Sequence, residues 1–297
     1  MADGIAATGT GAGLYREHAP PPALAGMVQA VWHARMAAPS PGPTPAGTAP
    51  FRVLPDGCMD LIVAHGGGLD PVILIAGTDD TARMVAHQPG RRHIGLRFRP
   101  GRMAALIDAP PAELVGTSHP AALLLAGGVH DAARHLADAP ADPARLDRLM
   151  RALGRAIEDR RRFVAPAAIG AALDHLATSD APLSIGQLAA ETGYGQRRFD
   201  RAVLRATGLT PRHLARVFRL QRMLSLARDA HAADILGLAR VAGLADLAAA
   251  AGYADQPHMT RDCRSLTGLP PARLLAEQGI VLAVRKLQDR AGPHQAC

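Results

Sequence analysis

The chain has 297 residues, 20% of them charged, and a formal net charge of +7. This length allows two domains with cores of their own, and no apolar run of about 18 residues is present to suggest a membrane span. The N-terminus lacks a basic region followed by an apolar one, so no signal peptide is expected. Three widely spaced cysteines favour a reduced, cytoplasmic protein.

The positive charge is concentrated in the second half of the chain. Residues 1–165 hold 17 Arg/Lys against 15 Asp/Glu, a net charge of +2, whereas residues 166–297 hold 16 against 11, a net charge of +5. A domain that binds nucleic acid needs positive charge to neutralise the phosphates, so an excess in the second half is expected if this half binds DNA. However, Lys286 is the only lysine and alanine is abundant, which indicates a compositional bias. Charge therefore supports DNA binding without establishing it.

Short strand patterns dominate the first hundred residues. Residues 1–13 are small and polar and are expected to be disordered, and residues 38–50 can only form a loop. Residues 51–65 read as a strand, a turn at Pro55–Gly57 and a second strand, so they predict a hairpin. Residues 72–76 form a buried strand candidate, and residues 92–99 alternate between apolar and polar. This pattern predicts a small β-barrel or sandwich.

The period changes to that of helices after Gly101. Residues 103–107 and 112–115 are short helical pieces, and residues 143–162 predict a longer amphipathic helix. Its apolar stripe either packs on its own domain or forms a dimer seam. The stripe consists of Leu146, Leu149, Leu153 and Ile157.

No catalytic residue, metal or cofactor is expected in the first half. His65, His87 and His93 lack the close spacing of a metal-binding histidine pair. Cys58 lies between Asp56 and Asp60, whose negative charge would raise the pKa of its thiol, so a structural cysteine is favoured over a reactive one.

The second half contains one helical pattern twice. A helix over residues 166–177 precedes a capping box at Ser184 and Gln187, a turn at residues 193–195 and a helix at 196–207. A long helix from Pro211 to about residue 229 follows, and then a short helix, a turn at Gly252 and a helix at 256–267 that Asp255 would cap. A short helix, a glycine turn and a second helix are typical of a helix-turn-helix.

The two copies agree in detail. Gly193-Tyr194 aligns with Gly252-Tyr253, and after a one-residue difference in the turn Thr207-Gly208-Leu209 aligns with Thr267-Gly268-Leu269. Apolar positions agree as well, Phe199 with Met259 and Val203 with Cys263. Such a repeat indicates two copies of one supersecondary unit.

Residues 166–278 resemble the DNA-binding domain of AraC/XylS-family transcriptional regulators, and GYADQPHMTRDCRSLTGLPP is close to the signature of that family's second unit. Met259 and Cys263 stand where larger apolar side chains are commoner. The pieces VLPDGCMDLI and GLRFRPGRMAALIDAPPAEL resemble a cupin-like regulatory domain that senses or dimerises in that family.

The expected fold is therefore α+β, with a small β-barrel or cupin-like domain before an all-α domain of two helix-turn-helix units joined by a long helix. The expected boundaries are 1–13 for a disordered tail, 14–162 for the regulatory domain, 163–279 for the DNA-binding domain and 280–297 for a C-terminal tail.

Base reading is expected in the first turns of each recognition helix, where the family's base-contacting positions also fall. Arginine pairs with guanine, glutamine with adenine, and aspartate accepts from cytosine. For Arg201 and Arg261, a phosphate contact or an intradomain salt bridge is the alternative. The expected readers are Arg197, Asp200 and Arg201 in the first unit and Gln256, His258, Thr260 and Arg261 in the second.

Four other arginines are expected to bind phosphates, which position a protein on DNA without specifying sequence. They are Arg198, Arg205, Arg212 and Arg264. A small anionic or polar effector, if the β domain binds one, would lie in the barrel mouth between residues 51–65 and 92–99. Its expected contacts are Arg52, Arg97 and Arg99, with outward-facing arginines as the alternative.

These features predict a sequence-specific transcription regulator that is not an enzyme. Its expected partner is double-stranded DNA. Further candidate partners are RNA polymerase, a second copy of the chain and an unidentified small-molecule effector. One rival is an enzyme or DNA-repair transferase that carries a borrowed DNA-binding domain, but the cysteine-rich metal module of such proteins needs more than three scattered cysteines. Another is a non-specific architectural binder, which two different recognition helices disfavour.

Overall fold

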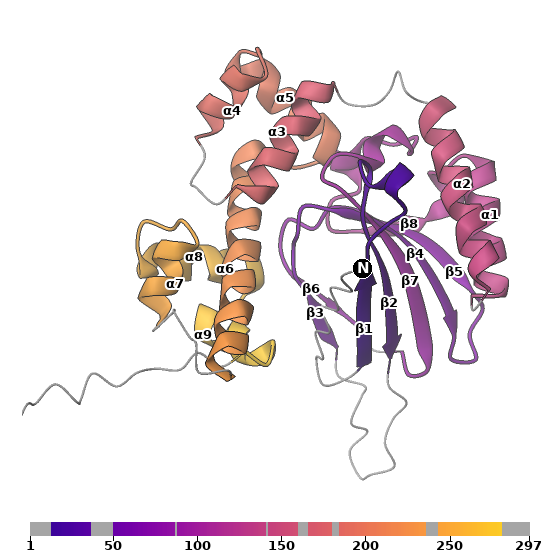
Figure 1. Ribbon diagram of the computed structural model, residues 1–297, viewed down its shortest axis with the longest axis horizontal. Coiled ribbons are helices and arrows are strands. Elements are labelled where there is room, and N and C mark those ends of the chain that lie inside the picture. The colour runs from indigo at the N-terminus through magenta and orange to yellow at the C-terminus, as the bar shows by residue number, and fades with distance from the viewer. Residues whose placement is uncertain are drawn as a thin grey trace, which may run out of the picture. The chain divides into compact units, whose positions relative to one another are not determined.

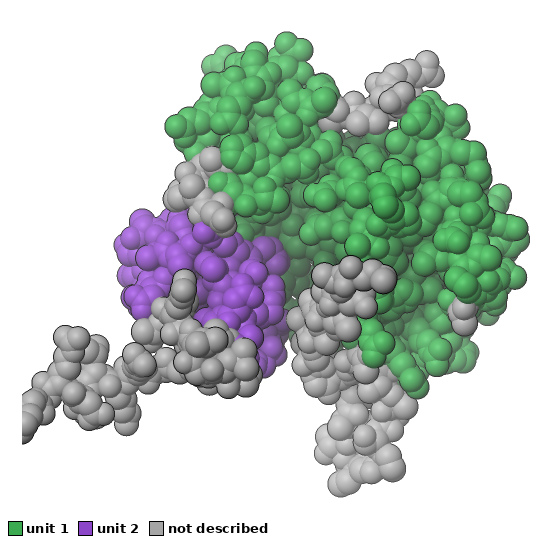
Figure 2. All heavy atoms as spheres, in the orientation of Figure 1, with its two compact units in different colours: residues 1–218 green, residues 219–297 purple. Residues whose placement is uncertain are grey.

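The computed structural model describes residues 13–36, 50–86, 88–140, 142–159, 166–179, 184–235 and 243–280. The predicted tail before residue 13, nearly all of the loop at 38–50, His87, residues 160–162 and residues 281–297 lie outside this part of the chain. Two compact units are present, residues 1–218 and residues 219–297 (Figure 2).

An antiparallel six-stranded sheet forms the framework of the N-terminal part (Figure 1). The strand order is β1-β2-β7-β4-β5-β8, so β1 and β8 are its edges. Over the described residues the sheet is not closed into a barrel; of the predicted alternatives, a small β-barrel or a cupin-like sandwich, the cupin-like form is compatible with this sheet. The strands are β1 Gly13–His18, β2 Val28–Met36, β4 Met59–Gly66, β5 Val72–Ala76, β7 Arg91–Phe98 and β8 Ser118–Pro120.

The predicted hairpin over residues 51–65 is wrong. Its first half, β3 Phe51–Val53, pairs with β6 Arg83–Val85 in a separate two-stranded sheet, whereas β4 pairs with β5 and β7. The turn at Pro55–Gly57 therefore carries the chain from the small sheet to the large one. The positive φ of Gly57, 78°, suits a sharp change of direction.

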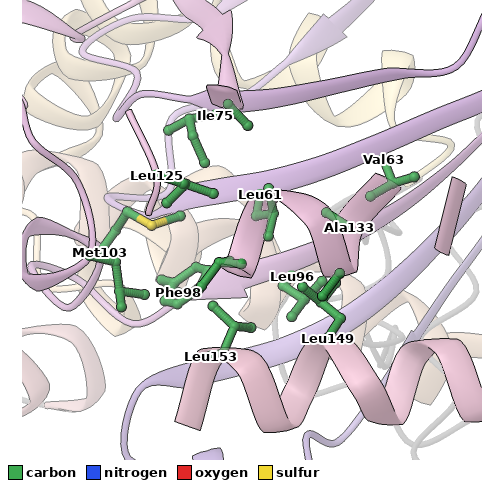
Figure 3. Packing of buried hydrophobic residues seen from close by; sticks show 14 of the residues in the cluster. Leu61, Val63, Ile75, Leu96, Phe98, Met103, Leu125, Ala133, Leu149 and Leu153 are labelled. Carbon is green, nitrogen blue, oxygen red and sulfur yellow. The ribbon is translucent and has the colours of Figure 1, made fainter. Parts of the chain in front are cut away.

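One face of the large sheet is covered by two helices, α1 Gly127–Asp138 and α2 Pro143–Asp159 (Figure 1). The predicted alternation in β7 is confirmed, because Ile94, Leu96 and Phe98 all point into this core. The stripe of α2 packs on its own domain, since Leu149 and Leu153 are fully buried among these sheet residues (Figure 3). The α2 stripe is therefore part of the domain core.

Shorter helical turns complete this part. The expected helical pieces at 103–107 and 112–115 are single 3-10 turns, Met103–Ala105 and Pro111–Glu113. Two further 3-10 turns span Pro22–Leu24 and Ala121–Leu123.

The rest of the described chain is helical, as predicted (Figure 1). In the first compact unit, α3 Ala167–Thr178, α4 Ile185–Glu191 and α5 Gln196–Thr207 precede α6. Helix α6 spans Pro211–Ile235, longer than predicted, and continues past Phe218 into the second unit. There, α7 Leu244–Ala250, α8 Gln256–Thr267 and α9 Pro271–Glu277 follow. No helix within the described ranges is long and apolar enough to cross a membrane.

Candidate DNA interface

The two helix-turn-helix units have the same turn. Gly193 and Gly252 follow α4 and α7 with φ of 71° and 84°, a region that favours glycine. The tyrosine after each glycine donates its backbone N–H to the helix before it, Tyr194 to Ala189 at 3.3 Å and Tyr253 to Ala248 at 2.9 Å. The repeat in the sequence is therefore a repeat in the structure.

The recognition helices α5 and α8 also end alike. The hydroxyl of Thr207 donates to Val203 O at 2.9 Å and accepts from the N–H of Leu209 at 3.1 Å. Thr267 makes the matching bonds to Cys263 O at 2.7 Å and from the N–H of Leu269 at 3.1 Å. A left-handed glycine then stops each helix, as the aligned Thr-Gly-Leu sequences predict.

The N-terminal caps of these units differ. Asp255 caps α8 by accepting from the N–H of His258 at 2.6 Å, as predicted. Ser184 stands at the N-cap of α4, but its side chain makes no capping hydrogen bond, so the predicted capping box with Gln187 is not formed. The helix begins at the predicted place without it.

On α5, two of the predicted readers are exposed. Phe199 and Val203 are buried against the rest of the unit, which directs Arg197 and Arg201 outward. Asp200 is half-buried and accepts a hydrogen bond from Gln196 Nε2 at 2.8 Å. Base reading by Asp200 would therefore compete with this internal bond.

On α8, Gln256 and Arg261 are exposed, whereas the other two predicted readers are engaged within the unit. The ring of His258 packs edge-on against Tyr253, with centroids 5.3 Å apart, and its Nε2 lies 3.7 Å from Asp262 Oδ2. Thr260 donates its hydroxyl to Gln256 O at 2.9 Å, which leaves its methyl group for contact.

The four predicted phosphate-binding arginines, Arg198, Arg205, Arg212 and Arg264, are all exposed. The Arg198 guanidinium lies over the Tyr194 ring, 4.2 Å from its centroid. Such a cation–π contact orients the guanidinium beside the recognition helix.

Two exposed residues of α5 were not among the predicted base readers. Gln196 aligns with the predicted reader Gln256, so the repeat contained the signal for it. Leu204 has 38% of its surface exposed and lies one helical turn after Arg201, off the buried stripe. An exposed leucine in this position could contact a thymine methyl group in a major groove.

The predicted effector residues lie in the sheet domain. Arg97, on the face of β7 opposite Phe98, is held by carboxylates: Nη1 lies 2.9 Å from Glu17 Oε1, and Nε lies 3.1 Å from Asp56 Oδ2 and 3.7 Å from Asp60 Oδ1. These groups, Arg97, Glu17, Asp56 and Asp60, are called the Arg97 cluster below. Burial opposes the charged form of Arg97, but the negative charges of Asp56 and Asp60 hold the pKa of its guanidinium well above the usual value.

Trp32 and Tyr15 border the Arg97 cluster. The Trp32 indole donates to Asp60 Oδ1 at 3.0 Å and lies against Gly95, where a β-carbon would be 1.9 Å from the indole Cε2. Tyr15 hydrogen-bonds Glu17, and its ring centroid lies 5.9 Å from that of Trp32.

The other predicted effector residues and Cys58 are also held in place. Arg99 Nε donates to Ala25 O at 2.7 Å, and Arg52 also has an interaction partner within the protein. Cys58 is buried, as a structural cysteine should be. Burial raises the pKa of its thiol most strongly, and Asp56 raises it further.

The titration of Asp60 leads to a prediction on stability. Burial raises its pKa from 3.8 to about 6, against the opposing effect of Arg97. Because the folded protein then binds a proton more readily than the unfolded chain, this contribution to stability is present below about pH 4 and is lost as the pH rises through 6. Between pH 7 and pH 5, the wild-type protein should gain about 1 kcal/mol more unfolding free energy than Asp60→Asn. Urea unfolding at both pH values measures the difference, and equal gains would contradict this account.

A groove of about 330 Å³ lies on the helix-covered side of the sheet, away from the predicted barrel mouth. His18 and His33 border it with ring centroids 5.6 Å apart, and Leu146 and Met150 of α2 form part of its lining. Within the described ranges, no three His, Cys, Asp or Glu side chains are grouped so that they could hold a metal ion.

Two family models match the sequence. Residues 16–120 match a domain of unknown function, DUF6597, and residues 188–277 match a helix-turn-helix domain. The second match runs from within α4 of the first unit through α6 to the end of α9, and it confirms the predicted helix-turn-helix domain. No curated protein matches the sequence.

Among solved structures, the chain is similar to ToxT from Vibrio cholerae. ToxT bound to (E)-4-(8-methylnaphthalen-1-yl)but-3-enoic acid is 11% identical, with a TM-score of 0.42 over 83% of this chain and 97% of ToxT. An apo lysine-to-alanine variant is 12% identical, with a TM-score of 0.41 over 84% and 97%. Unsaturated fatty acid-bound ToxT is 11% identical, with a TM-score of 0.38 over 77% and 90%. These TM-scores are low, so no residue role or ligand is transferred from ToxT.

Proposed function

We propose that the helix-turn-helix domain of this chain is of the AraC type and that the protein is a sequence-specific transcription regulator that reads two successive major-groove segments about 10 base pairs apart. The observation that carries this proposal is the structural repeat: the two recognition helices have the same turn and the same end, and they share an exposed glutamine and an exposed arginine but differ at other exposed positions. Arg197 of α5, which suits guanine, stands where α8 has Pro257, and Leu204 stands where α8 has Arg264. The operator should therefore be asymmetric.

The arginines around the recognition helices would supply affinity. Arg198, Arg205, Arg212 and Arg264 are exposed and have the charge to neutralise phosphates. Contacts of this kind fix register and orientation, and the readers then discriminate between bases. Asp200, His258 and Thr260 stay in the proposed reading set, with their internal hydrogen bonds rearranging on DNA.

The test of this function is selection of DNA sequences from a random library by the full-length protein, followed by binding to the selected site and to a scrambled one. Specific regulators of this kind bind their sites about 10³-fold or more tightly than other DNA. Equal affinity for the two DNAs would contradict sequence-specific recognition and leave a non-specific binder.

The salt dependence separates the two classes of contact. Replacing Arg212 by alanine should weaken binding to the selected and the scrambled DNA alike and make the slope of log affinity against log salt shallower by about one unit. Arg134→Ala, an exposed arginine on α1 of the sheet domain, is the matched control and should leave the slope unchanged. A steeper loss on the selected site alone would place Arg212 among the base readers.

For the sheet domain, residues 14–162, we propose a regulatory role without enzymatic activity. A small effector bound near Arg52, Arg97 or Arg99 would have to compete with the carboxylates that hold Arg97, so a ligand with hydrogen-bond donors fits there better than a simple anion. We also propose that the protein lies in the cytoplasm.

A further inference from the structure

On one side, the turn at Pro55–Cys58 contacts the Arg97 cluster through Asp56. Asp56 bonds Arg97 through Oδ2, at 3.1 Å, and accepts from the N–H of Cys58 through Oδ1, at 2.9 Å. Cys58 Sγ lies 3.2 Å from Gln29 Oε1 of β2. The turn is therefore tied to the sheet through one carboxylate and one thiol.

On its other side, the same turn packs against α6. A β-carbon on Gly57 would lie 2.7 Å from Cε1 of Phe218 and 3.3 Å from Cδ2 of Leu214. Leu214 is fully buried and Phe218 nearly so. Glycine is required here for two reasons, since its φ is positive and the Phe218 ring occupies the space that a β-carbon would need.

Phe218 is also the last residue of the first compact unit, and α6 runs on into the second. From Phe218 to the end of α6 at Ile235 the helix rises by roughly 25 Å, so a tilt of about 5° at Phe218 would displace its far end by about 2 Å. Packing at Gly57 therefore bears on the direction in which α6 leaves the first unit.

Other contacts hold the first helix-turn-helix unit on the sheet domain. Arg102 Nη2 pairs with Asp174 Oδ2 of α3 at 2.6 Å, and His213 Nε2 of α6 lies 2.7 Å from Asp80 O. At the end of α5, a β-carbon on Gly208 would be 2.7 Å from Pro111 O. Since these contacts do not involve the turn, they can keep the unit in place while the turn changes.

We propose that the Pro55–Cys58 turn is a positioning element for DNA reading, which couples the Arg97–Asp56 ion pair to the direction of α6 and so to the spacing at which the two recognition helices engage DNA. When Asp56 leaves Arg97, the turn loses one of its two ties to the sheet and keeps only the Cys58–Gln29 hydrogen bond, so the close packing of Gly57 on Phe218 can relax. Rearrangement of the Arg97 cluster by a bound ligand would act through the same turn. This inference rests on the proposed function.

The experiment uses the full chain and a selected operator whose two segments are brought closer or moved apart by one base pair. Gly57→Ala introduces a β-carbon that Phe218 must accommodate, and it should lower affinity at the native spacing by tenfold or more and change the preferred spacing. Gly68→Ala is the matched control, because Gly68 also has a positive φ, 71°, but nothing lies within 4 Å of the added carbon. Gly57→Ala combined with Phe218→Leu should recover part of the loss.

Asp56→Asn provides an independent variant that adds no bulk. It keeps the acceptor for the N–H of Cys58 but removes the charge that pairs with Arg97, and it should broaden the range of spacings that are bound. The proposal is overturned if Asp56→Asn, folded by circular dichroism, has the wild-type spacing profile, or if Gly57→Ala and Gly68→Ala behave alike. If Gly57→Ala does not fold, Asp56→Asn alone decides. Failure of the wild-type protein to prefer any sequence would instead contradict the proposed function.

Discussion

Replacing Phe98 by alanine is expected to lower the free energy of unfolding by about 3–5 kcal/mol. The ring is fully buried at the end of β7, in the core that the sheet shares with α1 and α2 (Figure 3). β2 and β4 flank it, since Phe98 is paired with Val28 and with Met59. Strands held on both sides leave little room for the cavity to collapse, so the upper part of the range applies.

Leu123→Ala is the control for Phe98→Ala. Leu123 is 72% exposed, and truncating it should change the unfolding free energy by less than about 0.5 kcal/mol. Urea unfolding followed by circular dichroism compares both variants with the wild type. A loss below about 1.5 kcal/mol for Phe98→Ala would mean that the core is loosely packed and that the face against α1 and α2 is not the centre of the domain.

The helical half could be predicted closely because its signals are local. The limits of α5 and α8 follow from neighbouring residues: a glycine turn and, for α8, Asp255 before the helix, and the Thr-Gly-Leu sequence after it. The internal repeat added a second, independent copy of each signal. Even there, the side chain of Ser184 does not cap α4, because a capping sequence allows the hydrogen bond but does not require it.

Pairing in the sheet domain depends on residues far apart in the chain, and here the sequence was less informative. Pro55–Gly57 does form a turn, but the strand before it pairs with β6 Arg83–Val85 and not with the strand after it. Likewise, the three carboxylates around Arg97 come from β1, β4 and the turn between the two sheets. Neither the pairing nor the cluster has a spacing that could be recognised along the chain.

The sequence also did not show which candidate readers form hydrogen bonds within the protein. Alignment of the two units places Asp200 and Thr260 at equivalent positions, but it does not show that Gln196 bonds the first or that the second bonds its own helix backbone. Such bonds depend on the helical spacing of four residues together with the chosen rotamers. Among the candidates, Arg201 is exposed on α5, and it provides the clearest test.

Replacing Arg201 by alanine is expected to reduce operator affinity by about 10- to 150-fold, equivalent to about 1–3 kcal/mol, and to relax base preference in one segment only. The reason is its position in the second turn of α5, opposite the buried Phe199 and Val203, where a guanidinium can reach guanine O6 and N7. Gln256→Ala on α8 should relax preference in the other segment. The two substitutions therefore serve as controls for each other.

The measurement is affinity across all single-base changes of the selected operator, at two salt concentrations. A base reader loses discrimination at its own position and leaves the other positions unchanged, because the contact that distinguished the bases there is gone. A phosphate contact instead lowers affinity for every sequence by the same factor and makes the salt slope shallower. If Arg201→Ala shows the second pattern, Arg201 positions the protein on the DNA backbone, and specificity in the first segment rests on Arg197 and the neighbouring Gln196 and Leu204 of α5.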